Sequence, residues 1–396
     1  MVLFDQAAAL PIKGYAWLPD LRRRAHGQPV PLRVLGRPAV AISGPDAARF
    51  FSRPGHLKPV PAIARLSGAG AVHTLDGRAH ELRKALFVAL LMPADGVDTL
   101  AKMVGEAFDQ AADRWRGGPP VSLFDGTARV IADAVARWVG VPLHERDLPA
   151  LAGDMVAMVD GFAAPGPRHA RARLARRRQE RGLTQLIEDV RREEPNPSPV
   201  SRIAHHLADG YLLDARTAAV EVLNIVRPAT AVAWLVAFAA HALERRPGHR
   251  DRLAESDEYA LAFTHEVRRF YPLTAFLAGR ATRDLRFQRV DIDRGTLVLL
   301  DVFGQHHDER VWPEPYEFRP DRFLGRPPGE FELIPQGGGD PRTGHRCPGE
   351  RITVALLGTL SRRLARLSYY LPPQDLTIDL ARIPARVRGG PRIVVT

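Results

Sequence analysis

The stretch QGGGDPRTGHRCPGE, residues 336–350, carries the single cysteine of the chain, Cys347. The residues that follow, RITVALLGTLSRRLARL, have apolar side chains at helical spacing, which places Cys347 at a helix start and Pro348 where a helix tolerates proline. A thiol at that place faces free backbone N–H groups, which are expected to lower its pKa. The resulting thiolate is the form of cysteine that binds metal ions or attacks electrophiles.

A lone cysteine is by default a small buried residue without chemistry. Here glycines surround the thiol, and glycine lets the backbone approach a flat, bulky group closely. One thiolate without a second metal ligand beside it indicates an iron that a macrocycle already holds. The glycines concerned are Gly337, Gly338, Gly339, Gly344 and Gly349.

A second unusual feature is an arginine in the longest apolar segment, residues 217–247, which is apolar nearly all round. Such a helix is buried in a large protein or spans a membrane, and Arg227 beside Pro228 favours a core helix. A buried guanidinium stays charged and is costly without an anion, yet residues 222–243 contain no acid. We therefore expect the substrate to supply the anion. Pro228 also frees the carbonyl of Asn224, which loosens the helix.

The elements that must position these residues follow from the hydrophobic pattern. Helical spacing dominates from Ala79 to Leu261. Strands are expected at PLRVLG and PAVAIS before this region, and at RATRDLRF, VDID, TLVLLDVF, LTIDL and RIVVT after it. The sequence has no repeat and no long linker, so we expect one domain over residues 1–396, mainly α with a small β region.

Charge and composition narrow the classes of partner. The net charge is +11 and the pI is near 10.4, so nucleic acid, a membrane surface and anionic small molecules must be considered. Much of the basic excess lies in residues 167–182, where arginines occur on every side of a helix, as on a solvated surface. No nucleic-acid-binding motif accompanies the charge, so we do not expect such a partner. One cysteine and an N-terminus without a signal-peptide pattern favour the cytoplasm.

Three motifs, in this order, resemble those of the cytochrome P450 superfamily of haem-thiolate proteins. They are THEVRRFYP with Glu266 and Arg269, FRPDRF with Arg322, and GHRCPGE with Cys347. An i,i+3 ion pair on a helix surface is common and contributes only about 0.2–0.5 kcal/mol, so the whole constellation carries the resemblance. It implies the cytochrome P450 fold, with haem b (iron protoporphyrin IX) between the central helix and the cysteine loop and Cys347 as the iron ligand. It also implies that the other three residues form a buried network that holds this loop.

In ordinary P450 oxygenases the central helix carries an acid followed by threonine, and here Arg227 and Pro228 stand at those positions. This pair and the long cysteine loop resemble the bacterial fatty acid peroxygenases, which use hydrogen peroxide directly, and the resemblance covers most of the chain. It implies that the fatty acid carboxylate pairs with Arg227 and itself serves as the acid–base group. Carbons α and β then lie nearest the oxidant, which implies hydroxylation there or oxidative decarboxylation to a terminal alkene.

Further site residues follow from the same resemblance. His73 falls where the group has glutamine or histidine on the distal side, which leaves the choice of product open; a loop histidine is otherwise most often a surface or hydrogen-bonding residue. Ser67 replaces an aromatic residue of the group, so Phe276 is the expected aromatic contact of the substrate. Partners of the haem propionates are implied at His80, Lys84, Arg280 and His345.

The implied activity is therefore a fatty acid peroxygenase without an obligatory redox partner. Two alternatives stay open. One is a different haem enzyme: a reductase-dependent oxygenase of another carboxylate, a lyase or an isomerase. The other is a non-catalytic protein that binds haem or an anion. Addition of peroxide without an electron donor separates the peroxygenase from both alternatives.

Overall fold

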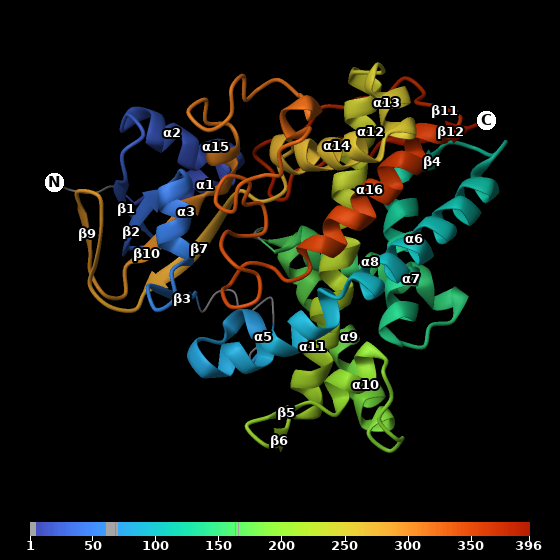
Figure 1. Cartoon of the computed structure of the whole chain (residues 1–396), viewed down its shortest axis with the longest axis horizontal. Coiled ribbons are helices and arrows are strands. Elements are labelled where there is room, and N and C mark those ends of the chain that lie inside the picture. The colour runs from blue at the N-terminus through green and yellow to red at the C-terminus, as the bar shows by residue number, and fades with distance from the viewer. Residues whose placement is uncertain (1–4, 61–67, 69, 163, 165) are drawn as a thin grey trace.

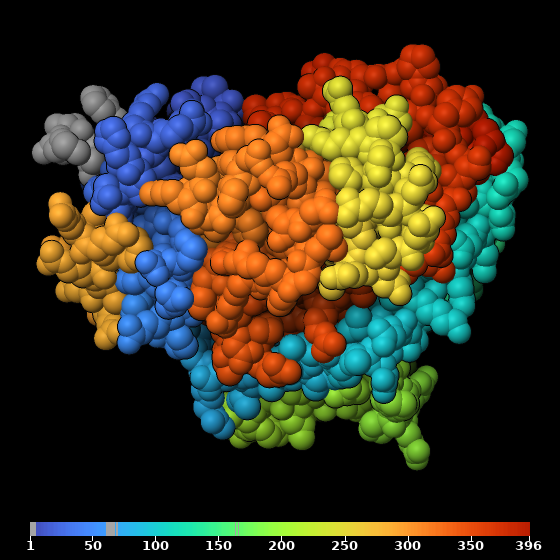
Figure 2. All heavy atoms as spheres, turned by 45° about the horizontal axis from the view of Figure 1, so that its top comes forward, coloured from blue at the N-terminus to red at the C-terminus, as the bar shows by residue number. Residues whose placement is uncertain are grey.

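The computed structural model describes residues 5–60, 68, 70–162, 164 and 166–396. As predicted, the fold is mainly α with a small β region. Figure 1 shows the larger sheet and the N-terminal helices at one side of the molecule and the long helices at the other. In Figure 2 the orange segment that leads from the sheet toward the cysteine loop covers the junction between these two parts.

The long helices are α5 (Gly77–Leu91), α6 (Ala94–Trp115), α7 (Leu123–Val139), α8 (Leu148–Asp160), α9 (Pro167–Val190), α11 (Ala215–Thr230), α12 (Val232–Arg245), α14 (Asp257–Phe270) and α16 (Glu350–Arg366). The short helices are α1 (Leu10–Lys13), α2 (Trp17–Arg24), α3 (Pro45–Ser52), α10 (Pro199–Ala204), α13 (His249–Glu255) and α15 (Val302–His306). Helix α11 begins after Asp214, whose side chain accepts a hydrogen bond from the Thr217 amide at 2.9 Å, an ordinary N-cap.

The five-stranded sheet has the order β1-β2-β10-β7-β3, in which only the β2–β10 pair is parallel. Its strands are β1 (Val30–Val34), β2 (Arg37–Ile42), β3 (Leu57–Pro59), β7 (Phe276–Ala281) and β10 (Leu297–Asp301). The smaller pieces are β4 (Val121–Ser122), β5 (Leu207–Ala208), β6 (Tyr211–Leu212), β8 (Leu285–Phe287), β9 (Val290–Ile292), β11 (Tyr369–Tyr370) and β12 (Arg392–Val395). The prediction of a strand at LTIDL is wrong: Ile378 makes one isolated bridge to Val387, and β12 pairs with β11 and β4 instead.

The apolar segment predicted as a core helix forms α11 and α12, which Figure 1 shows in yellow-green behind α16. The range Ala215–Arg245 is long and apolar enough to cross a membrane, but 89% of its most apolar window is buried inside the protein. It is therefore a core element. The helix runs through Pro228 and is interrupted at Ala231, whose amide contacts the carbonyls of both Arg227 and Pro228.

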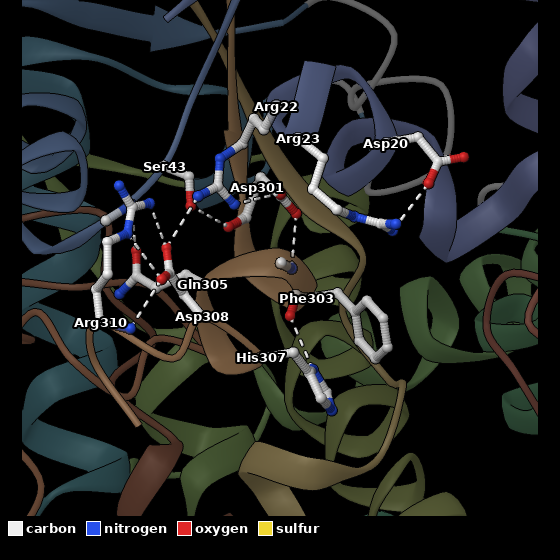
Figure 3. A network of polar contacts seen from close by, with 12 residues as sticks. Asp20, Arg22, Arg23, Ser43, Asp301, Phe303, Gln305, His307, Asp308 and Arg310 are labelled. Atoms are coloured by element: carbon white, nitrogen blue, oxygen red, sulfur yellow. Dashed lines mark hydrogen bonds and ion pairs between the residues drawn. The ribbon is translucent and has the colours of Figure 1, made fainter. Parts of the chain in front are cut away.

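Two buried ion networks fix the parts that surround the cysteine loop. In the first, Arg22 of α2 donates to Asp301 and Asp308, each at 3.0 Å, and the other Asp301 oxygen accepts from the Gly304 amide at the start of α15. Figure 3 shows Arg22 between these two aspartates. Because breaking a buried pair leaves an uncompensated charge, this network joins the N-terminal helices firmly to the end of β10.

The second network contains the predicted trio. Glu266 and Arg269 are fully buried and pair at 2.7 Å, and Arg322 lies 3.2 Å from the same carboxylate. Arg269 also donates to the carbonyls of His306 and Pro315. The trio thus holds the segment that leads to the cysteine loop.

Arg268, the neighbouring residue on α14, contacts the cysteine loop itself. Its guanidinium donates to the Gln336 side chain at 3.2 Å and pairs with Glu350. These contacts join α14 to the start of the loop and to the first turn of α16.

Candidate functional site

A cavity of about 310 Å³ lies where the cysteine loop meets α5, α11 and the start of β7. Cys347 and Pro228, which the sequence placed in one site, both line it. The other lining residues that bear on function are His73, His80, Lys84, Asn224, Thr274, Leu277, Gln336 and His345. Among the residues that the structure describes, no group of three or more His, Cys, Asp or Glu side chains could hold a bare metal ion.

The cysteine loop is shaped by its glycines and by hydrogen bonds to Gln336. The Cys347 amide donates to the Gln336 carbonyl at 3.0 Å, and the Gln336 side chain donates to Thr353 on α16 at 3.0 Å. Gly337 has a φ of +94°, a conformation that suits glycine. At Gly338, a Cβ atom would lie only 2.9 Å from the Phe331 ring. Glycine at both positions therefore follows from the loop's own geometry.

The prediction that the helix start lowers the pKa of the Cys347 thiol is wrong for the protein chain without a bound metal. Helix α16 begins at Glu350, so Cys347 and Pro348 lie just before it. Burial raises the pKa of the Cys347 thiol, and the Gly349 amide and the positive charge of Lys84 offset only part of that effect. A coordinated metal ion would deprotonate such a thiol outright.

Three of the four predicted propionate partners gather at the cavity. The rings of His80 and His345 lie 4.1 Å apart, and Lys84 donates to the carbonyl of Arg346. Burial lowers the pKa of Lys84 to about 8 and that of His80 to about 4. These values show that the wall is desolvated and would gain from anionic partners.

The fourth partner, Arg280, lies on β7 beyond the lining residue Leu277. Its Nε atom is buried and has no hydrogen-bond partner among the described residues. Arg280 does not line the cavity, so its contact with a haem propionate stays a prediction, which the unpartnered Nε atom supports. The donor set thus fits the implied cofactor.

His73 lies in the turn of residues 72–74 and lines the cavity. Its side chain is exposed to solvent-sized space although many protein atoms lie around it. Burial, and next the positive charge of Arg227, lowers the pKa of His73 to about 3. The imidazole is therefore neutral.

Arg227 is buried on α11 beside the cavity. Its Nη2 atom donates to Oδ1 of Asn224 at 2.8 Å. The pKa of Arg227 is lowered to about 10, because burial and then the charge of Arg176 lower it more than the carboxylates of Glu221 and Glu180 raise it. The guanidinium remains charged at neutral pH, and the wall next to Pro228 is therefore cationic.

Of the residues expected at the substrate wall, the structure describes Phe276 but not Ser67. Phe276 packs edge-on against Trp17, with ring centroids 5.7 Å apart, while its neighbours Thr274 and Leu277 line the cavity. Phe276 is thus adjacent to the wall rather than among its lining residues, and its contact with substrate stays a prediction. Ser67 lies outside the described residues.

The sequence reasoning missed the polar residues behind Arg227. Glu221 lies one residue before the acid-free range 222–243, and Asn224 connects its carboxylate to Arg227. A signal was present: Glu221, Asn224 and Arg227 are spaced three apart, which places polar groups along one line of an otherwise apolar helix. Arg83, the partner of Glu221 on α5, gave no such signal because it lies far away in the sequence.

Comparison with known proteins agrees with this geometry. A sequence model of the cytochrome P450 family matches residues 249–374. Cytochrome P450SP alpha (CYP152B1) in complex with (R)-ibuprofen is 33% identical, with a TM-score of 0.94 over 99% of this chain and 98% of that one. Cytochrome P450 OleT F79A with arachidonic acid is 33% identical, with a TM-score of 0.93 over 100% and 98% of the two chains. Cytochrome P450EX alpha (CYP152N1) with myristic acid is 30% identical, with a TM-score of 0.94 over 100% of this chain and 97% of that one. The chain belongs to the cytochrome P450 family and, within it, to the group of these CYP152 proteins.

Proposed function

We propose that this haem-thiolate protein is a peroxygenase that uses hydrogen peroxide to oxidise fatty acids at carbon α or β. The observation that carries the proposal is the buried, charged Arg227 beside a cavity that Cys347 also lines. A desolvated guanidinium attracts a carboxylate much more strongly than it attracts a neutral group. The CYP152 structures named above were solved with carboxylic acids, which supports the same class of substrate.

The cofactor of this proposal is haem b, with Cys347 as its iron ligand and His80, Lys84, Arg280 and His345 as partners of the propionates. When bound, it supplies the iron centre at which peroxide is activated and one oxygen atom is transferred. The chain's own contribution is to orient the substrate. A carboxylate held by Arg227 fixes the first carbons of the fatty acid next to the reacting centre, while the rest of the chain extends away.

In this proposal the carboxylate of the bound fatty acid transfers the proton. Arg227 cannot donate a proton at neutral pH, and Pro228 has no hydroxyl, so neither can replace the acid and threonine of ordinary P450 oxygenases. The carboxylate oxygen that Arg227 leaves accessible can take a proton from peroxide and return it. His73 is neutral and contributes hydrogen bonding rather than charge. Pro228 shapes the wall next to the carboxylate.

The products follow from the atom balance of the two possible reactions. Hydroxylation converts a fatty acid and hydrogen peroxide into a hydroxy fatty acid and water. Oxidative decarboxylation converts the same pair into a terminal alkene, carbon dioxide and two water molecules. Both reactions use peroxide as the sole oxidant, so no obligatory redox partner is needed. We further propose that residues 1–396 act as one domain in the cytoplasm, which the single cysteine supports.

The experiment is incubation of the purified holoprotein with saturated fatty acids of graded length and hydrogen peroxide, without reductase or NAD(P)H, followed by mass identification of products. Hydroxy acids or alkenes one carbon shorter are expected. A protein that turns over only with a reductase and dioxygen would exclude the peroxygenase. A protein without product under either regime would favour the non-catalytic alternative. The ferrous carbon monoxide complex must first show the red-shifted Soret band of thiolate ligation, and Cys347→Ser must lose that band.

A further inference from the structure

A buried chain of polar contacts joins the two distal elements of the cavity. Oε1 of Glu221 accepts from the Val72 amide at 2.9 Å and from Arg83 Nη1 at 2.6 Å. Oε2 of the same carboxylate accepts from Asn224 Nδ2 at 2.9 Å, and Asn224 Oδ1 accepts from Arg227 Nη2 at 2.8 Å. Glu221 is fully buried, so water does not compete for these bonds.

The polarity of the chain allows one orientation of Asn224. Its NH₂ group meets the Glu221 carboxylate, which only accepts, and its carbonyl meets the Arg227 guanidinium, which only donates. A flipped amide would place donor against donor and acceptor against acceptor. The negative charge of Glu221 therefore determines which way Asn224 points, and Asn224 determines where one edge of the guanidinium is held.

The same carboxylate also holds the turn that carries His73. The Val72 amide belongs to that turn, and Arg83 contacts the Gly70 carbonyl as well as Glu221. A single buried acid thus fixes the position of the His73 turn relative to α11, on which Arg227 lies.

We propose that Glu221 is a positioning residue that, through Asn224, orients Arg227 for the carboxylate end of the substrate and aligns the His73 turn with it. The substrate class in this statement rests on the proposed function. A carboxylate gains fully from a guanidinium only when two N–H groups point at its two oxygens, so a small rotation weakens recognition of the acid while leaving the contacts of the alkyl chain unchanged.

The alternative is a purely structural role, because Glu221 and Arg83 form a buried ion pair whose loss would destabilise the fold. The two roles differ in one measurable ratio. Loss of stability alone weakens the binding of a fatty acid and of the fatty alcohol of equal length by the same factor. Loss of orientation weakens the binding of the acid alone.

The test measures dissociation constants of myristic acid and 1-tetradecanol on the holoprotein by calorimetry, together with Tm. Glu221→Gln keeps the shape but turns an NH₂ group toward Asn224, which must then flip; we expect the preference for the acid over the alcohol to fall about tenfold or more. Asn224→Asp places a carboxylate directly on Arg227, so the preference should be lost. Glu180→Gln, which removes another buried acid that acts on Arg227 only through its charge, is the matched control and should keep the preference within about threefold.

A Glu221→Gln protein that keeps the wild-type preference, even with a lower Tm, would overturn the proposal. If that variant does not fold, Asn224→Leu distinguishes the same two roles, because it leaves the Glu221–Arg83 pair intact and removes only the link to Arg227. An unchanged preference for the acid over the alcohol in Asn224→Leu would contradict the positioning role. The proposed function fails separately, in the wild-type protein, if the acid binds no more tightly than the alcohol.

Discussion

His73 and Arg227 are coupled electrostatically: the charge of the guanidinium, added to the larger effect of burial, helps to lower the pKa of the imidazole to about 3. The pair comes from separate elements, the turn of residues 72–74 and helix α11. A charged arginine beside a neutral histidine gives the cavity one fixed positive charge at this wall. A monoanion neutralises such a wall, whereas a protonated histidine would have required a second negative charge.

The first prediction concerns the pH dependence of fatty acid oxidation. Because the pKa of His73 lies far below its ordinary value of 6.5, His73 stays neutral between pH 5 and pH 9. His73→Gln should therefore leave the acid limb of the rate against pH in place, within about half a unit. A limb near pH 6.5 that disappears in the variant would show that the imidazole titrates and that the assignment of a neutral group is wrong.

The second prediction concerns Arg227 itself. Removing a charged hydrogen-bond donor from a buried site costs about 1.5–3 kcal/mol, so Arg227→Ala should lower kcat/KM for a fatty acid at least about tenfold. Arg227→Lys should recover only part of this loss, because a point charge cannot reproduce the planar fork of the guanidinium. The control is the carbon monoxide spectrum, which should match the wild type in both variants. An unchanged kcat/KM in Arg227→Ala would refute the ion pair with substrate.

Much of the site could be predicted because its signals are local. The thiol among glycines, the arginine inside an apolar helix and the Glu266–Arg269 pair each depend on residues that lie within a few positions of one another. The structure adds contacts that local sequence patterns do not indicate. Arg83 reaches Glu221 from a distant helix, and Arg268, next to the expected Arg269, contacts the cysteine loop at Gln336.

The errors also have physical causes. LTIDL alternates like a strand, but β12 found its partners in β11 and β4, so Ile378 was left with one bridge. For Cys347, the expectation from the helix start included only the favourable amides, whereas burial of the thiol outweighs them. Strand pairing and desolvation both depend on the whole fold, which a motif does not contain.

The third prediction tests the network of Figure 3. Asp301 is fully buried against Arg22, and burial raises the pKa of its carboxyl group. Asp301→Asn keeps the shape but leaves Arg22 with less negative charge, so the free energy of unfolding should fall by about 3–5 kcal/mol in guanidinium titrations of the holoprotein. Arg23→Ala, which breaks the exposed pair with Asp20, should change it by less than about 0.5 kcal/mol. Equal effects of the two variants would contradict the importance of the buried pair.

The fourth prediction concerns acid stability and depends on His241 of α12, whose Nδ1 lies 2.8 Å from the Tyr271 hydroxyl. Burial, followed by the charges of Arg245 and Arg246, lowers the pKa of His241 from 6.5 to about 4. Between these values the unfolded chain binds a proton at His241 that the folded protein does not. The contribution of His241 to stability is therefore present above pH 6.5 and is lost as the pH falls toward 4.

For this one group the loss between pH 7 and pH 5 amounts to about 1–2 kcal/mol. His241→Gln removes the titrating ring, so the difference in unfolding free energy between pH 7 and pH 5 should shrink by that amount, even if the variant is less stable at pH 7. His144→Gln, at an exposed position, serves as the matched control and should keep the wild-type difference. A pH dependence that is the same in wild type and His241→Gln would mean that the ring is not held neutral by its surroundings, because only a group whose pKa changes on folding can make stability depend on pH.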